Sequence, residues 1–203
     1  ETHPQLAKEW HPTKNKQLSP QEFSKGSSIK VWWLCAKGHE WEAIINSRNG
    51  GRGCPYCKNR KAGYGNDLKT LYPKVAKEWH SEKNGDLKPQ NFTYGAKKNV
   101  WWICKFGHEW KAVIYNRTKG TKCPYCTNHK VGYGNDLKTK YPNIAKEWHP
   151  NRNRDLKPSK ILPGSGIKVW WKCSKGHEWA TAPNQRTAKN GTGCPKCFWN
   201  RNT

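Results

Sequence analysis

Nine cysteines and three histidines recur in a pattern that could hold metal ions. Each of three sets has a Cys and a His separated by three residues, then a Cys-Pro-x-Cys segment 14 or 16 residues further on. Two close pairs of thiolate and imidazole groups, joined by a hairpin-length spacer, can surround one tetrahedral zinc ion. We therefore predict three Zn²⁺ ions, one for each set. The predicted ligands are Cys35, His39, Cys54 and Cys57; Cys104, His108, Cys123 and Cys126; and Cys173, His177, Cys194 and Cys197.

Three other uses of these cysteines are weaker explanations. Disulfides would strand one of the nine cysteines and leave the recurring histidines unexplained. The Cys-Pro-Tyr-Cys segment is similar to a glutaredoxin-type redox motif, but that motif works inside a βαβ domain with one reactive thiol. Catalytic zinc needs an open coordination position, and four protein ligands leave none. We therefore expect structural zinc and a protein that is not an enzyme.

The chain is strongly basic. It has 38 Lys and Arg against 14 Asp and Glu, a formal net charge of +24 over 203 residues. Three thiolates with one Zn²⁺ leave each site at about −1, so a large positive excess remains. A surplus of this size attracts polyanions, and nucleic acid is the first expectation.

The ligand sets belong to three copies of one sequence unit. Ala-Lys-Glu-Trp-His begins at Ala7, Ala76 and Ala145, a period of 69 residues, and Val-Trp-Trp and Gly-His-Glu-Trp recur with it. We divide the chain into zinc modules at 1–62, with a truncated start, 63–131 and 132–203. The Gly-Tyr-Gly-Asn-Asp-Leu-Lys segments at 63–69 and 132–138 are predicted to be linkers that let successive modules follow a groove.

The elements within one unit can be predicted from its pattern. Residues 3–11 have apolar positions at helical spacing, and residues 29–35 are rich in β-branched and aromatic side chains, which is typical of a strand. Trp41, Ala43 and Ile45 alternate with Glu42, Ile44 and Asn46, which predicts a half-buried second strand over residues 40–48. A proline follows the first cysteine of each Cys-Pro-x-Cys segment, where it suits the first turn of a helix. The expected fold is a small zinc-stabilised α+β unit, repeated three times: short helix, β-hairpin, short helix.

The repeated motifs resemble a known family. The Leu-Ala-Lys-Glu-Trp-His, Val-Trp-Trp, Gly-His-Glu-Trp and Cys-Pro-x-Cys segments are similar to the tandem "probable zinc-ribbon" repeats of bacteria, phages and large DNA viruses, which sometimes accompany endonucleases of the very-short-patch-repair type. The resemblance covers nearly the whole chain. It implies a treble-clef-like finger with a zinc knuckle, a hairpin and a helix opening at Cys-Pro-x-Cys, and it implies DNA binding by association. The incomplete first copy and the insertion in the third depart from the pattern.

Several recurring basic residues are candidate nucleic-acid contacts. An arginine near the end of the predicted second strand either clamps a phosphate or reads a guanine, or else makes a salt bridge or caps a carbonyl. Lysines before the first strand and basic residues after Cys-Pro-x-Cys are predicted to contact the nucleic-acid backbone. The candidates are Arg48, Arg117, Arg186, Lys30, Lys98, Lys168, Lys58, Arg60, Lys61, Lys130 and Arg201.

Other recurring positions are expected to serve the fold. In each Trp-Trp pair the rings must point to opposite faces of the strand, so one ring is free to cover a neighbour or to stack on an unpaired base. His11 and its counterparts are expected to cap backbone groups or to lie at the surface. Asn15 and its counterparts are expected to form turns.

These observations predict a non-enzymatic array that binds nucleic acid, with double-stranded DNA favoured. RNA-binding modules and a zinc-structured protein-interaction or inhibitor scaffold remain alternatives. The array could be the DNA-recognition part of a larger phage or mobile-element protein. The chain has no apolar run of membrane-spanning length and no signal segment, so we expect a monomer in a reducing intracellular compartment.

Overall fold

A computed structural model describes residues 4–199 of the chain. Its contacts divide the chain into two compact units, residues 1–103 with 111–121 and residues 104–110 with 122–203. The division passes through the second repeat, whose zinc-binding turn belongs to the second unit. The three repeats are therefore described one at a time.

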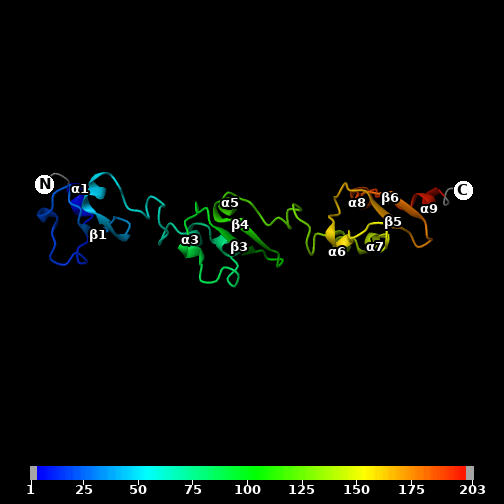
Figure 1. The fold of residues 1–203 in the computed structure, drawn as a ribbon, viewed down its shortest axis with the longest axis horizontal. Coiled ribbons are helices and arrows are strands. Elements are labelled where there is room, and N and C mark those ends of the chain that lie inside the picture. Colours follow the sequence, from blue (N-terminus) through cyan, green and yellow to red (C-terminus); the bar gives the residue numbers. More distant parts are fainter. Residues whose placement is uncertain (1–3, 200–203) are drawn as a thin grey trace. The chain divides into compact units, whose positions relative to one another are not determined.

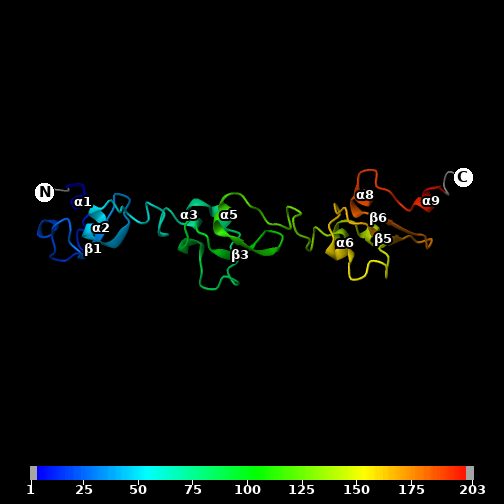
Figure 2. The same cartoon turned by 45° about the horizontal axis from the view of Figure 1, so that its top comes forward.

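A two-stranded antiparallel hairpin is the centre of the first repeat (Figure 1). Its register pairs Trp33 with Trp41 and Val31 with Ala43. A short helix precedes the hairpin and another follows it directly (Figure 2). The elements are α1 (Pro4–Lys8), the 3-10 turn η1 (Pro20–Glu22), β1 (Lys30–Leu34), β2 (Glu40–Ile44) and α2 (Ile45–Asn49).

The second and third repeats have the same hairpin and an additional helical turn at their start. The second repeat contains α3 (Leu68–Leu71), α4 (Pro73–Ala76), η2 (Pro89–Asn91), β3 (Asn99–Ile103), β4 (Glu109–Val113) and α5 (Ile114–Thr118). The third contains α6 (Leu137–Lys140), α7 (Pro142–Ala145), η3 (Pro158–Lys160), β5 (Val169–Lys172), β6 (Glu178–Thr181), α8 (Pro183–Thr187) and α9 (Pro195–Trp199).

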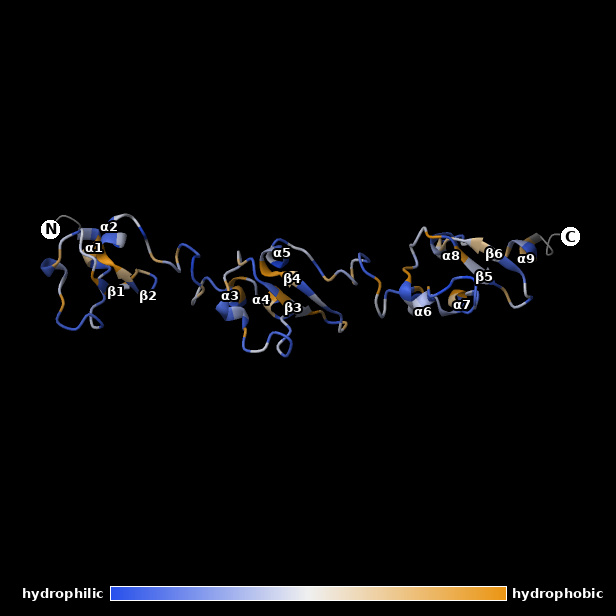
Figure 3. Cartoon of the chain, in the orientation of Figure 1, coloured by the Kyte–Doolittle hydropathy of each residue, from blue (hydrophilic) through white to orange (hydrophobic). Residues whose placement is uncertain are grey.

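The first strand of each hairpin supplies the core. Val31 and Trp33 are buried on one face of β1, while Trp32 on the other face is half-buried. Trp102 and Trp171, the counterparts of Trp33, are fully buried. Figure 3 shows hydrophobic residues on parts of the hairpins and largely hydrophilic loops around them. The prediction that the paired tryptophans face opposite ways is confirmed.

The second strand is shorter than the sequence predicts. It ends at Ile44, and Ile45 begins helix α2. The Ile45 amide donates to the Ile29 carbonyl, so the chain turns into a helix at this point. Ile45 is buried as expected, but the helical turn also buries Arg48, three residues further on and therefore on the same face.

The helix predicted at Cys-Pro-x-Cys is present only in the third repeat. There Pro195 begins α9. In the first repeat the segment forms a turn instead, because Asn59 has a left-handed backbone (φ 54°) and the Arg60 amide reaches back to the Pro55 carbonyl. This 6→1 hydrogen bond after a left-handed residue is how helices end, so the helix stops after one turn.

Asn15 does more than form the predicted turn. Its side-chain oxygen accepts from the Trp32 amide at 2.7 Å, and its side-chain nitrogen donates to the Trp32 carbonyl at 2.9 Å. Asn84 and Asn153 make the same two contacts to the backbone of Trp101 and Trp170. The amide thus continues the hydrogen-bond ladder along the outer edge of β1, which corrects the prediction of a simple turn.

None of the helices within residues 4–199 is long and apolar enough to cross a membrane.

Candidate metal centre

Each repeat brings its three cysteines and one histidine together. In all three clusters the ligand atoms lie within 4.8 Å of one another. In the first, the Cys35 and Cys57 sulfurs are 3.8 Å apart, and His39 Nδ1 is 3.4 Å from both. Tetrahedral zinc with Zn–S of about 2.3 Å and Zn–N of about 2.0 Å requires separations of about 3.8 and 3.5 Å. The twelve ligands predicted from the sequence therefore form three sites that fit zinc.

The first ligand pair lies on the turn between the strands. Cys35 follows β1, and its amide donates to the His39 carbonyl at 3.1 Å. Gly38 has φ of 79°, a left-handed conformation that a side chain would strain, and its amide donates to the Cys35 carbonyl. This knuckle aims the Cys35 sulfur and the His39 ring at the Cys-Pro-Tyr-Cys turn.

The thiols of a metal-free site differ in acidity. Burial raises the pKa of Cys35, but hydrogen bonds from the backbone at His39 and Lys37 outweigh it and lower the pKa to about 7. Burial and then the neighbouring Cys54 and Cys35 sulfurs raise the pKa of Cys57 to about 11. The same division recurs in the other repeats, with a lowered pKa for Cys104 and Cys173 and a raised pKa for Cys126 and Cys197. A bound cation would favour ionisation of Cys57 and its counterparts, whose pKa is otherwise raised.

A carbonyl from the following linker orients the histidine ligand. His39 Nε2 lies 2.8 Å from the Tyr64 carbonyl, and His108 Nε2 lies 2.7 Å from the Tyr133 carbonyl. A hydrogen bond from Nε2–H fixes the tautomer that leaves Nδ1 free for the metal. The Tyr56 ring also stacks on His39 with centroids 5.2 Å apart. The linker is thus part of the metal site.

The predicted linker is anchored at both ends, to the repeat before it and to the repeat after it. The Asn66 side chain donates to the carbonyls of Tyr56 and Lys61 in the first repeat. Asp67 caps α3 by accepting from the Thr70 amide. Leu68 is fully buried in the second repeat. The anchoring recurs after the second repeat through Asn135, Asp136 and Leu137.

The three arginines proposed as nucleic-acid contacts lie inside the repeats. Arg48 is only 5% exposed, pairs with Glu9 and donates to the Arg52 carbonyl. Its guanidinium also lies over the Trp33 ring at 5.1 Å. Arg117 and Arg186 pair in the same way with Glu78 and Glu147. A guanidinium so enclosed has little surface for phosphate, so the salt-bridge and carbonyl-cap alternative describes these residues.

The remaining candidates, except one, lie at the surface. Lys30 pairs with Glu42 at 2.8 Å, and Arg60 donates to the Gly53 carbonyl while staying exposed. Arg201 falls outside the described residues. The other exposed members of the set are Lys58, Lys61, Lys98, Lys130 and Lys168.

The outward ring of each Trp-Trp pair is covered by its own repeat. Lys14 lies 4.4 Å above the Trp32 ring, and His11 meets its edge. His11 accepts from the Lys14 amide through Nδ1 and contacts Glu40 at 3.0 Å through Nε2, so the predicted capping role is right. Lys14, and then His11, lower the pKa of the Glu40 carboxyl.

Two exposed aromatic residues were not predicted as site residues. Tyr64 and Tyr133 stand in the linkers beside the ligand histidines His39 and His108, with 87% and 83% of their surface exposed. Their signal in the sequence was the identical repetition of Gly-Tyr-Gly-Asn-Asp-Leu-Lys, which we interpreted only as a linker.

Comparison with known proteins agrees with this geometry. The probable treble clef zinc finger domain family matches three segments of the chain, residues 6–60, 75–129 and 144–198. The search of curated proteins gives no match. The matched segments contain all twelve metal ligands and together cover most of the sequence. The chain therefore belongs to the probable treble clef zinc finger family, with three tandem copies of the domain, each carrying a site for one zinc ion.

Proposed function

We propose that the chain is a non-enzymatic array of structural zinc modules that binds nucleic acid, with double-stranded DNA as the favoured partner. The observation that carries the proposal is the distribution of acidic and basic side chains between ion pairs and the free surface. Glutamates at recurring positions form ion pairs inside the repeats, whereas most of the basic residues are left at the surface.

The ion pairs recur at equivalent positions. Glu9 pairs with the buried Arg48, and Glu40 is held by His11 and Lys14. In the third repeat Glu178 lies near His149, Arg152 and Lys172. Lys and Arg outnumber Asp and Glu by 38 to 14, and most of them are exposed, so a surplus of basic side chains that phosphates can reach remains after these pairs form.

The surface we favour for DNA is the turn that follows the second ligand pair. In the first repeat it holds Lys58, Arg60 and Lys61, all exposed, and Tyr64 stands beyond them. In the second repeat Lys130 and Tyr133 lie at the corresponding place. The zinc site makes this turn rigid, so its charges are held in a fixed arrangement that suits contact with a regular phosphate backbone.

RNA is the second candidate, and exposed aromatic rings favour it. Tyr64 and Tyr133 are almost fully exposed, and Phe106 is 65% exposed in the zinc knuckle of the second repeat. Unpaired bases stack on such rings. A preference for single-stranded RNA in competition would select this alternative.

The four ligands at each site fill a tetrahedral shell, which supports a structural role for the ion. Each module would contribute a few contacts, and linking three of them would raise the overall affinity.

The test is a titration of labelled duplex DNA with the zinc-loaded chain over a series of salt concentrations, with single-stranded RNA as competitor. Replacing Lys58, Arg60 and Lys61 together by Gln should weaken duplex binding and reduce the slope of log K against log salt by about three, one for each phosphate contact. A charge-matched control replaces Lys8, Lys16 and Lys25 by Gln and should change the slope less. Equal effects in both variants would show that the turn is not the contact surface, and binding that survives high salt would contradict phosphate binding altogether.

A further inference from the structure

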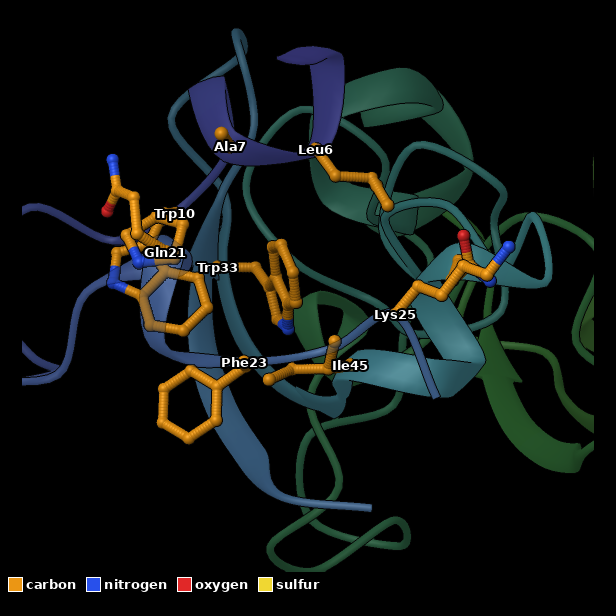
Figure 4. Close-up of a pocket in the computed structure, with 10 residues that line it drawn as sticks. Leu6, Ala7, Trp10, Gln21, Phe23, Lys25, Trp33 and Ile45 are labelled. Atoms are coloured by element: carbon orange, nitrogen blue, oxygen red, sulfur yellow. The ribbon is translucent and has the colours of Figure 1, made fainter. Parts of the chain in front are cut away.

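The first repeat has a groove that is filled in the other two. The groove has a volume of about 360 Å³ and lies between α1, the chain near η1, and the start of α2. Figure 4 shows Leu6 and Ala7 on one side of it, Phe23 and Ile45 on the other, and the Trp33 ring between them. Its walls are therefore the residues that form the hydrophobic core of the repeat.

In the third repeat one leucine occupies the equivalent space. Leu137 is fully buried and forms a cluster with Ile161, Val169 and Trp171. Ile144 and Trp148 pack against that cluster. By the 69-residue period, Ile144, Trp148, Ile161 and Trp171 are the counterparts of Leu6, Trp10, Phe23 and Trp33, which line the groove.

The second repeat is filled in the same way. Leu68 is fully buried, and its amide donates to the Phe92 carbonyl at 2.8 Å, as the Leu137 amide does to the Ile161 carbonyl at 2.9 Å. The corresponding acceptor in the first repeat is the carbonyl of Phe23. No backbone amide within residues 4–199 donates to it. The groove thus offers both an apolar cavity and a hydrogen-bond acceptor at the place where the leucine amide would be.

The segment that supplies the buried leucine is the same in the second and third repeats. We call this leucine, Leu68 or Leu137, the plug. Leu68 and Leu137 each follow an Asn-Asp pair whose aspartate caps the helical turn by accepting from Thr70 or Thr139. Leu68 stands seven residues before Val75, and Leu137 seven residues before Ile144. Val75 and Ile144 correspond to Leu6, so the plug and the groove have a fixed sequence register.

Core residues of the first repeat are slightly more exposed than their counterparts in the second, as the open groove predicts. Trp33 is 2% exposed and Ile45 is 7% exposed, while their counterparts Trp102 and Ile114 are both 0% exposed. The core of the first repeat keeps a face that the other repeats cover.

We propose that the groove of the first repeat is an acceptor site for an Asn-Asp-Leu-Lys segment of polypeptide placed directly before the repeat. The leucine side chain fills the cavity between Leu6, Phe23 and Trp33, and its amide donates to the Phe23 carbonyl. The site is selective for a leucine-sized apolar side chain that follows a helix-capping aspartate.

The test extends the full chain at its N-terminus with Gly-Tyr-Gly-Asn-Asp-Leu-Lys, which places the leucine seven residues before Leu6. A matched extension carries Ser in place of Leu. Burying a leucine stabilises by about 1.5–3 kcal/mol, so amide hydrogen exchange in β1 should slow by at least about tenfold with Leu and change little with Ser. Exchange in β3 and β5 of the same chains, whose repeats already hold their plug, serves as the internal control.

Equal protection by the Leu and Ser extensions would overturn the proposal, as would slowing of exchange in β5 alone. A third sample adds the free peptide Gly-Tyr-Gly-Asn-Asp-Leu-Lys-Thr-Leu-Tyr-Pro to the unextended chain. Protection of β1 by this peptide, lost when its first leucine is replaced by serine, would show that the groove also takes the segment from a separate molecule and would support the same assignment of the site. Both readouts are independent of nucleic-acid binding.

Discussion

The first and third repeats have the same set of zinc ligands, but they differ in the contacts that linker residues make to the metal site and to the core. In the first, the Tyr64 carbonyl orients the ligand His39, while the groove beside Trp33 is open. In the third, Leu137 fills the groove, and within the described residues no hydrogen-bond partner reaches Nε2 of His177. Within residues 4–199, the first repeat thus shows the linker contact at its metal site and the third shows the filled core, while the second repeat shows both.

This difference shows that a linker has two separate tasks. Its first half, up to Asn66, supports the metal site of the repeat before it, and its second half, from Asp67, completes the core of the repeat after it. Support of the metal site and completion of the core can be disturbed independently by substitutions, whose expected effects range from loss of a zinc ion to a small change with pH.

Loss of a zinc ligand should have the largest effect. Cys54→Ser and Cys194→Ser should each lower the zinc content from three ions to two and unfold the affected repeat, since small units of this kind depend on the metal for folding. Native mass spectrometry gives the zinc content, and hydrogen exchange identifies the unfolded repeat. Retention of three ions, or a folded repeat without its ion, would contradict structural zinc.

Replacing a buried linker leucine should have the second-largest effect. Leu137→Ala should destabilise the third repeat by about 2–5 kcal/mol, because a fully buried leucine is replaced by a cavity. Leu68→Ala should do the same to the second repeat. Hydrogen exchange along denaturant titrations resolves the repeats, and the first repeat should respond to neither variant. A decrease of less than about 1 kcal/mol in the free energy of unfolding in both variants would show that the leucines do not stabilise the cores of these repeats.

Weakening the linker support should affect metal release. Asn66→Ala removes the hydrogen bonds that hold the linker to Tyr56 and Lys61. Zinc should then leave the first repeat about tenfold faster, which is the lower end of the effect of outer-shell changes at zinc sites. The measurement is chelator-driven release, with each site assigned by ligand variants. Asn135→Ala should act only on the second repeat, and the third repeat should be unchanged in both.

A change of pH should alter the zinc affinity of all three sites alike. It should therefore have the smallest effect on the difference between the first and third repeats. With their pKa raised to about 11 or 12, Cys57, Cys126 and Cys197 are protonated at neutral pH in the metal-free state, and zinc must displace that proton. Zinc affinity should therefore rise about tenfold per pH unit near neutrality and fall as the pH is lowered. Competition titrations between pH 6.5 and 8 check this. A ratio of affinities between the first and third repeats that changes with pH would indicate that their thiols differ.

The zinc sites could be predicted from the sequence because ligand chemistry restricts both residue type and spacing. The hairpin strand was predictable because alternation places Val31 and Trp33 on one face whatever surrounds them. By contrast, Arg48 looked like a surface residue, and only the helical turn that begins at Ile45 brings it under the core tryptophans.

The contacts of Asn15 and of the linkers escaped prediction for a related reason. Asparagine and glycine are typical of turns, and composition cannot reveal that an amide side chain reaches a strand 17 residues away. Nor could it reveal that Asn66 and Leu68, two positions apart, belong to different repeats. Such contacts are long-range, and local propensity contains no information about them.

The anchoring of the linkers also decides where this protein can be divided. A cut between residues 62 and 63 follows the sequence motif, yet it leaves Tyr56 and Lys61 without Asn66 and deprives His39 of the Tyr64 carbonyl. A segment from Asp67 to Asn135 instead contains one plug, one hairpin, one complete ligand set and the carbonyl that orients its histidine. This segment is offset from the motif period, so recombination that adds or removes a finger keeps both the linker contacts of one zinc site and the buried leucine of the next core when the exchange point falls between Asn66 and Asp67.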